Sequence, residues 1–120
     1  MKSVLVLRHA KSSWKHPELT DHDRPLNKRG KRDAPRMGEL LRNEHLIPEV
    51  IISSTAIRAR DTAEAVAKAC GYKGQITLNR SLYAAGPEAY IEAVSKVILA
   101  ASRLRTILLY SQTTTIVTQK

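Results

Sequence analysis

The sequence contains a single cysteine, Cys70, so the chain cannot form an internal disulfide. No group of cysteines and histidines has the spacing of a zinc site, and no carboxylate cluster suits magnesium. The longest apolar runs, at 4–7 and 107–110, are far shorter than the roughly 20 residues that span a bilayer, and no secretory signal is visible. We therefore expect a cytoplasmic protein without a membrane anchor, a bound metal or a cofactor.

Phenylalanine is absent, and aromatic residues make up only 4% of the chain. Acidic side chains are also few: 11 Asp and Glu stand against 20 Lys and Arg, giving a formal net charge of +9. Basic residues are concentrated at 28–36, which favours acidic or phosphorylated partners, although a solvated helix face would look the same. Nucleic acid is not the expected partner, because no aromatic pair has the spacing of a base-stacking platform.

The length and composition suit one compact domain over residues 1–120. Apolar runs typical of strands occur at 3–7, 50–52, 75–78 and 106–110. Helical patterns lie between them, at 27–43, around 63–70 and from Pro87 onward. Alternation of this kind predicts an α/β fold: a three-layer αβα sandwich with a largely parallel sheet and helices on both faces.

The helical patterns also predict which faces are buried. In the first helix Pro35 must either kink the helix or mark its true start. Gly71 is suited to close the second helix in a left-handed conformation. The expected buried faces are Ala34, Met37 and Leu41 in the first helix, Ala63, Val66, Ala67 and Cys70 in the second, and Ile91, Val94, Ile98 and Ala101 in the third.

Two strands end in residues that could carry chemistry. A segment from Arg8 to Ser13, beginning with Arg8-His9, follows the first strand, and a segment from Ser54 to Ala63 follows the second. Ligands bind beyond the carboxyl ends of strands in open α/β sheets, so both segments are expected at one edge. Guanidinium groups keep a neighbouring imidazole neutral and nucleophilic, and they match phosphate oxygens. The combination is suited to phosphoryl transfer without a metal.

Several segments, in order along the chain, resemble the histidine phosphatase superfamily, which includes the cofactor-dependent phosphoglycerate mutases. Within it, they look like the SixA-type phosphohistidine phosphatases, and the resemblance extends to about residue 109. The segments are Arg8-His9-Ala10-Lys11-Ser12-Ser13-Trp14, Asp23-Arg24-Pro25-Leu26-Asn27, Arg32-Asp33-Ala34-Pro35-Arg36-Met37-Gly38, Ser54-x-x-x-Arg58-Ala59-x-x-Thr62-Ala63 and Leu82-Tyr83.

The resemblance implies that His9 is the nucleophile that becomes phosphorylated, and that Arg8 and Arg58 bind the phosphoryl oxygens. Taken singly, His9 could instead be a strand-terminal histidine, and each arginine could be part of a surface ion pair. Glu88 lies where related mutases carry an acidic residue. However, a glutamate in the first turn of a helix is equally expected from the helix dipole, and we do not assign it as the acid.

The resemblance breaks at residues 110–120. Members of the family follow their fourth strand with a Gly-His-Asn-Pro type sequence, whose histidine contacts the phosphoryl group, whereas residues 110–113 read Tyr-Ser-Gln-Thr. His16, His22 and His45 precede the second strand, and their order along the chain argues against any of them as a replacement. We expect either a truncated or frame-shifted end or a genuinely short family member.

The sequence thus predicts a metal-independent phosphohistidine phosphatase that acts through a covalent phosphohistidine on His9. Turnover is expected to be impaired, because the second catalytic histidine of the family is missing. The partner would be a phosphorylated protein. The alternatives are a phosphatase of small phosphate esters and an inactive module that binds phosphoproteins through Arg8, Arg58 and the basic stretch.

Overall fold

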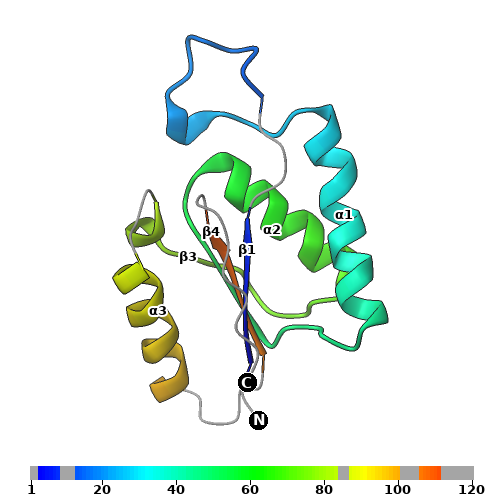
Figure 1. Cartoon of the computed structure of the whole chain (residues 1–120), viewed down its shortest axis with the longest axis vertical. Coiled ribbons are helices and arrows are strands. Elements are labelled where there is room, and N and C mark those ends of the chain that lie inside the picture. The colour runs from blue at the N-terminus through cyan, green and yellow to red at the C-terminus, as the bar shows by residue number, and fades with distance from the viewer. Residues whose placement is uncertain (1–2, 9–12, 84–86, 101–105, 112–120) are drawn as a thin grey trace.

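The computed structural model describes residues 3–8, 13–83, 87–100 and 106–111, with side-chain positions for 13–83 and 88–96. Within these ranges the strands and helices alternate as expected (Figure 1). The strands are β1 (Ser3–Arg8), β2 (Val50–Ser53), β3 (Thr77–Leu78) and β4 (Thr106–Ser111). The helices are α1 (Lys28–Asn43), α2 (Ile57–Cys70) and α3 (Pro87–Ala100), with 3-10 turns η1 (Asp21–Asp23) and η2 (Arg80–Leu82).

The described sheet is entirely parallel, in the order β1-β4-β2-β3. The last strand in sequence therefore lies between the first two. In its register, Tyr110 of β4 pairs with Leu7 on one side and with Ser53 on the other. The carboxyl ends of β1, β4 and β2 consequently lie side by side at one edge of the sheet, where loop 13–27 extends beyond them (Figure 1).

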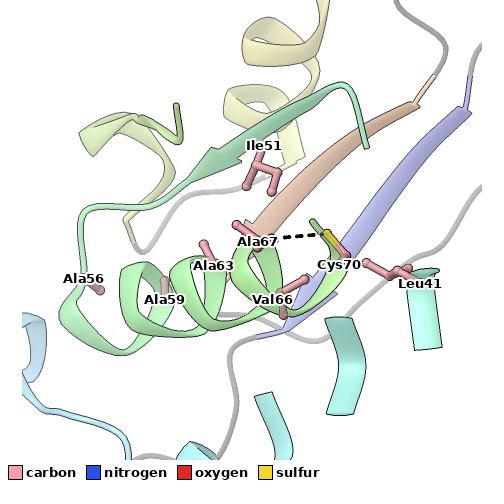
Figure 2. Close-up of a cluster of buried hydrophobic side chains, with 8 residues drawn as sticks. All are labelled: Leu41, Ile51, Ala56, Ala59, Ala63, Val66, Ala67 and Cys70. Atoms are coloured by element: carbon pink, nitrogen blue, oxygen red, sulfur yellow. Dashed lines mark hydrogen bonds between the residues drawn. The ribbon is translucent and has the colours of Figure 1, made fainter. Parts of the chain in front are cut away.

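Helix α2 packs against one face of the sheet, and the main apolar core lies at this contact. The core joins Ile51 of β2 to Leu41 of α1 and the inner face of α2 (Figure 2). The predicted buried face of α2 is confirmed in full, because Ala63, Val66, Ala67 and Cys70 are all buried. Gly71 ends the helix with φ 79°, the left-handed conformation expected there.

Helix α1 lies outside α2, against its far side (Figure 1). The Asn27 side chain accepts a hydrogen bond from the Gly30 backbone N–H and caps the helix, which then continues through Pro35. The helix therefore begins at Lys28 and not at Pro35. The inward face carries Gly30, Ala34, Gly38 and Leu41. The prediction that Met37 shares this face is wrong, because its side chain is 37% exposed.

Helix α3 covers the opposite face of the sheet, which completes the predicted three layers (Figure 1). The prediction that Ile91 is buried is wrong, since it is 65% exposed. Ala93 is buried instead, packed with Ile52 and Leu82, and the Tyr90 hydroxyl donates to the Leu82 carbonyl at 3.3 Å. Val94 is partly buried as predicted. The side chains of Ile98 and Ala101 lie outside the described ones.

No helix in the described ranges is both long enough and apolar enough to span a membrane.

Candidate functional site

The candidate site lies at the carboxyl edge of the sheet, where the predicted residues were expected. Arg8 is the last residue of β1 and pairs with Ser111 in register. His9 lies outside the described residues, and the structure describes only the backbone of Arg8. Because one strand separates β1 from β2, the ends of these two strands are about 10 Å apart. The two strand ends therefore lie in one region of this edge.

Among the predicted site residues, Arg58 is the one whose side chain the structure describes. It lies in the first turn of α2. Its side chain is buried, with only 3% of the residue exposed. The guanidinium donates to both the main-chain oxygen and the carboxylate of Asp21, the latter at 3.0 Å. Arg58 does form an ion pair, as the alternative reading expected, but with a buried guanidinium and not at the surface.

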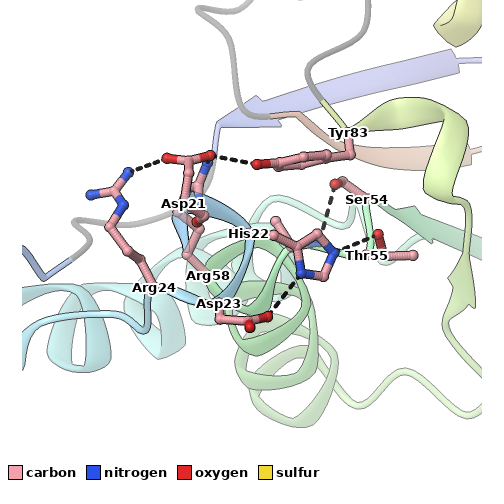
Figure 3. Close-up of polar contacts among 9 residues, drawn as sticks. Asp21, His22, Asp23, Arg24, Ser54, Thr55, Arg58 and Tyr83 are labelled. Atoms are coloured by element: carbon pink, nitrogen blue, oxygen red, sulfur yellow. Dashed lines mark hydrogen bonds and ion pairs between the residues drawn. The ribbon is translucent and has the colours of Figure 1, made fainter. Parts of the chain in front are cut away.

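Asp21 joins three donor side chains, two of them from distant parts of the chain (Figure 3). Besides Arg58, the Tyr83 hydroxyl donates to its carboxylate at 2.7 Å, and Arg24 Nη2 donates at 3.1 Å. The hydrogen bond from Tyr83, followed by those from Arg58 and Arg24, holds the pKa of Asp21 below its usual range. The same hydrogen bond raises the pKa of Tyr83. Asp21 therefore stays ionised at neutral pH and ties loop 13–27 to α2.

Loop 13–27 is fixed by contacts near its two ends. The Ser13 backbone N–H donates to the Pro25 carbonyl at 2.8 Å. The Arg24 guanidinium lies 3.5 Å from the centroid of the Trp14 ring, a cation–π contact. Arg24 is buried and Trp14 is largely exposed. The loop thus holds its 3-10 turn η1 against the N-terminal end of α2.

His22 lies in the same cluster, and sequence reasoning missed it. Its Nδ1 is 3.0 Å from Asp23 Oδ1, and its Nε2 is 2.9 Å from Thr55 Oγ1, in the bend between β2 and α2 (Figure 3). Its ring meets the ring of Tyr83 edge-on, with centroids 4.9 Å apart. Order along the chain argued against His22, but loop 13–27 brings it to the bend that follows β2, at this edge.

The bend that leads into α2 is buried and contains an internal hydrogen bond. Ser53 and Ser54 are fully buried, and Ser54 Oγ accepts a hydrogen bond from the Ala56 backbone N–H at 3.2 Å. The positive end of the α2 dipole faces this bend, beside the Arg58 guanidinium. A buried cation and a helix N-terminus together favour an anionic ligand.

Two other predicted features can be placed. Glu88 is exposed in the first turn of α3, the position that the helix dipole favours. Among the described side chains, no three or more His, Cys, Asp or Glu residues are grouped so as to hold a metal ion. The described side chains of the site carry guanidinium, carboxylate, imidazole and hydroxyl groups.

Comparison with known proteins gives a family match. The model of the histidine phosphatase superfamily (branch 1) matches residues 4–82. An uncharacterized chloroplast protein of Arabidopsis thaliana is 42% identical over 65 residues, which cover 54% of this chain and 30% of that protein. An uncharacterized protein of Mycobacterium tuberculosis is 37% identical over 92 residues, 76% of this chain and 54% of that protein. The chain therefore spans between about a third and about half of the length of these relatives.

A solved structure gives the same result. A protein of Agrobacterium tumefaciens assigned as the phosphohistidine phosphatase SixA superposes with a TM-score of 0.79 and 31% identity, over 92% of this chain and 68% of that one. The predicted αβα fold, which resembles that of phosphoglycerate mutases, is confirmed, and so is the family resemblance.

Proposed function

The chain belongs to the histidine phosphatase superfamily (branch 1), and from this membership we propose that it takes phosphoryl groups onto His9 as a covalent phosphohistidine. Arg8 and Arg58 bind the oxygens of the phosphoryl group during transfer, and no metal takes part. Planar guanidinium groups neutralise the charge that spreads over these oxygens in the transition state. The reaction fits the reducing cytosol in which an unpaired cysteine such as Cys70 persists.

One observation carries this proposal: a buried guanidinium at the sheet edge where the strand before His9 also ends. Arg58 is 3% exposed, and its fork is held by two oxygens of Asp21. A fork held in this way is oriented before the substrate arrives, which is the arrangement that favours transition-state stabilisation. In the sheet, β4 alone separates β1 from β2, the strand that leads to Arg58.

We propose a phosphohistidine on a partner protein as the substrate. The 31% identity to a protein assigned as SixA supports this class of substrate, as does the exposed basic stretch of α1, which suits an acidic partner surface. The basic side chains of this stretch are Lys28, Arg29, Lys31, Arg32 and Arg36.

We propose that hydrolysis of the phosphohistidine is slower than transfer of the phosphoryl group onto His9. β4 ends between β1 and β2 at this edge of the sheet. In the sequence, Gln112 and Thr113 follow β4 where the family resemblance implies a histidine. Losing one preorganised donor costs about a hundred- to thousandfold in rate. The same substitution favours a second candidate function, a module that binds phosphoproteins without releasing phosphate.

The test is single-turnover labelling of His9 with radioactive phosphoramidate, a small P–N donor. We expect an acid-labile phosphoryl group on His9 that His9→Ala abolishes. Arg58→Ala should slow labelling about a hundred- to thousandfold, because it removes a preorganised cation. Arg58→Lys, which keeps the charge but loses the fork, should be intermediate. The matched control is Arg42→Ala, since Arg42 is exposed near the far end of α1.

Equal labelling of the Arg58 and Arg42 variants would contradict the assigned role of Arg58. Phosphate binding without any label on His9 would favour the binding module. Efficient cleavage of sugar phosphates, with phosphohistidine peptides left intact, would favour a phosphatase of small phosphate esters.

A further inference from the structure

His22 is held in a way that suits proton transfer. Its Nδ1 lies 3.0 Å from Asp23 Oδ1 and its Nε2 lies 2.9 Å from Thr55 Oγ1, so a carboxylate and a hydroxyl fix the ring from opposite sides. The ionised Asp23 accepts from Nδ1–H, which leaves Nε2 as the nitrogen that gains or loses a proton. The side chain is 30% exposed, so a substrate can reach it.

The neighbouring groups Asp21, Tyr83, Arg24 and Arg58 do not exchange protons near neutral pH. Asp21 accepts hydrogen bonds from three donors, and these keep its pKa low. The pKa of Tyr83 is raised by its bond to Asp21, so its hydroxyl keeps its proton. The Arg24 and Arg58 guanidinium groups do not lose their protons in proteins. Imidazole is the side chain that exchanges protons near neutral pH.

We propose that His22 is the acid–base residue of this site, with Asp23 and Thr55 as its positioning residues. The role rests on the function proposed above. During transfer, a nitrogen of His9 forms a bond to phosphorus while the donor's P–N or P–O bond breaks. The electron pair of the broken bond goes to the leaving atom, which takes the proton from His22 Nε2.

The second half of the reaction restores both rings. Neutral His22 Nε2 accepts a proton from the water that attacks phosphorus. The P–N bond to His9 breaks, and its electron pair returns to the His9 ring. General acid catalysis of this kind contributes about a hundred- to ten-thousandfold, most of it where the leaving group is poor.

The test compares two donors in single turnover, with the formation of phosphorylated His9 as the readout. The p-nitrophenolate of p-nitrophenyl phosphate departs without a proton, whereas the alkoxide of benzyl phosphate needs one. We expect His22→Gln, which retains hydrogen-bonding groups but transfers no proton, to slow labelling by benzyl phosphate about a hundredfold. Labelling by p-nitrophenyl phosphate should change less than about threefold.

Two further variants separate proton transfer from positioning. Asp23→Asn and Thr55→Val keep the imidazole but remove the hydrogen bond on one side of it. They should therefore slow the labelling of His9 by benzyl phosphate by an intermediate factor and shift the pH–rate profile of this labelling. In His22→Gln, the pH–rate profile of labelling by benzyl phosphate should lose the limb that reports on the general acid. His45→Asn is the matched control, because His45 is exposed beyond the C-terminus of α1 and has φ 57°, which asparagine tolerates.

Equal slowing of both donors in His22→Gln would overturn the proposal, because it would indicate a binding or folding role. Unchanged rates with both donors would overturn it as well. If neither ester phosphorylates His9 while phosphoramidate still does, the role of His22 fails and the proposed function stands. If phosphoramidate gives no label on His9 either, the proposed function fails as well. Circular dichroism and urea unfolding of each variant show whether the fold is kept.

Discussion

Asp21 is the residue on which the described site depends most. It lies in a short 3-10 turn, yet it accepts hydrogen bonds from side chains on α2, beyond η2 and within its own loop. No periodic pattern in the sequence indicates such a residue, because its partners Arg58 and Tyr83 are 37 and 62 positions away. Its negative charge also offsets two buried or partly buried guanidinium groups.

Replacing Asp21 by Asn should destabilise the protein in a pH-dependent way. Its pKa is lowered from 3.8 in the folded state, so its contribution is complete above about pH 4 and is lost as pH falls through the lower folded value. Because the side chain is 53% exposed, we expect a loss of only about 1 kcal/mol at pH 7. Urea unfolding from pH 7 to pH 2.5 measures the difference.

The matched control is Glu39→Gln, since Glu39 is an exposed acid on α1. A stability difference between the unmodified protein and Asp21→Asn that stays constant down to pH 2.5 would contradict the assigned cause.

His22 and Arg58 show what the sequence could and could not indicate at single residues. Arg58 was predicted from its position after a strand, because the ends of parallel strands meet at one edge. His22 was dismissed from its order along the chain. Its contact with Thr55 spans 33 positions and depends on how loop 13–27 folds, which neither spacing nor periodicity specifies.

At the scale of elements, the close approach of α1 and α2 depends on Gly38. A Cβ atom there would lie 2.6 Å from both the Ala69 Cβ and the Val66 carbonyl oxygen. Sequence periodicity assigned the contact to larger side chains and so placed Met37 inward. A helix pair in contact through glycine and alanine leaves no room for methionine, and Met37 turns outward.

Gly38→Ala should therefore destabilise the fold, even though alanine favours helix more than glycine does. One clashing atom belongs to the backbone of α2, so the helices must separate. We expect a loss of about 1–3 kcal/mol in the free energy of unfolding, measured in urea. Lys31→Ala, on the exposed face of the same helix, is the control and should change stability by less than about 0.5 kcal/mol. A stabilised Gly38→Ala variant would show that the helices are not so close.

Gly71 ends α2 as predicted, whereas the buried faces of α1 and α3 were predicted only in part. Gly71 and Asn27 act through their own backbone and side chains, which are local effects that the sequence contains. The face of α3 depends instead on tertiary packing. Ala93 is buried with Ile52 and Leu82 and Ile91 is exposed, against the prediction from periodicity.

At the scale of the whole molecule, positive charge is in excess. The formal net charge of +9 is spread over 120 residues, and several basic side chains are neighbours on the exposed face of α1. Like charges at this density repel one another in the compact state more than in the unfolded chain. The layers and the parallel sheet were predicted from alternation alone, but this surface field depends on where each side chain points.

Salt should therefore stabilise the protein. Raising NaCl from 0.01 to 0.15 M shortens the Debye length from about 30 to about 8 Å, which screens the repulsion. We expect the urea midpoint to rise over this interval and then level off. Lys31→Glu lowers the net charge by two and should reduce the gain. A midpoint that falls with salt would mean that attractive pairs, such as Arg58 with Asp21, dominate.

The position of β4 in the sheet also constrains how the molecule is assembled during synthesis. In the described sheet β1 pairs with β4 alone, so Ser3 meets its partner Thr106 only after more than a hundred residues have been made. During synthesis β1 therefore stays unpaired until β4 has been made, while β2, α2 and β3 can already associate. The pairing that fixes the end of β1 therefore forms only after β2, α2 and β3 have been made.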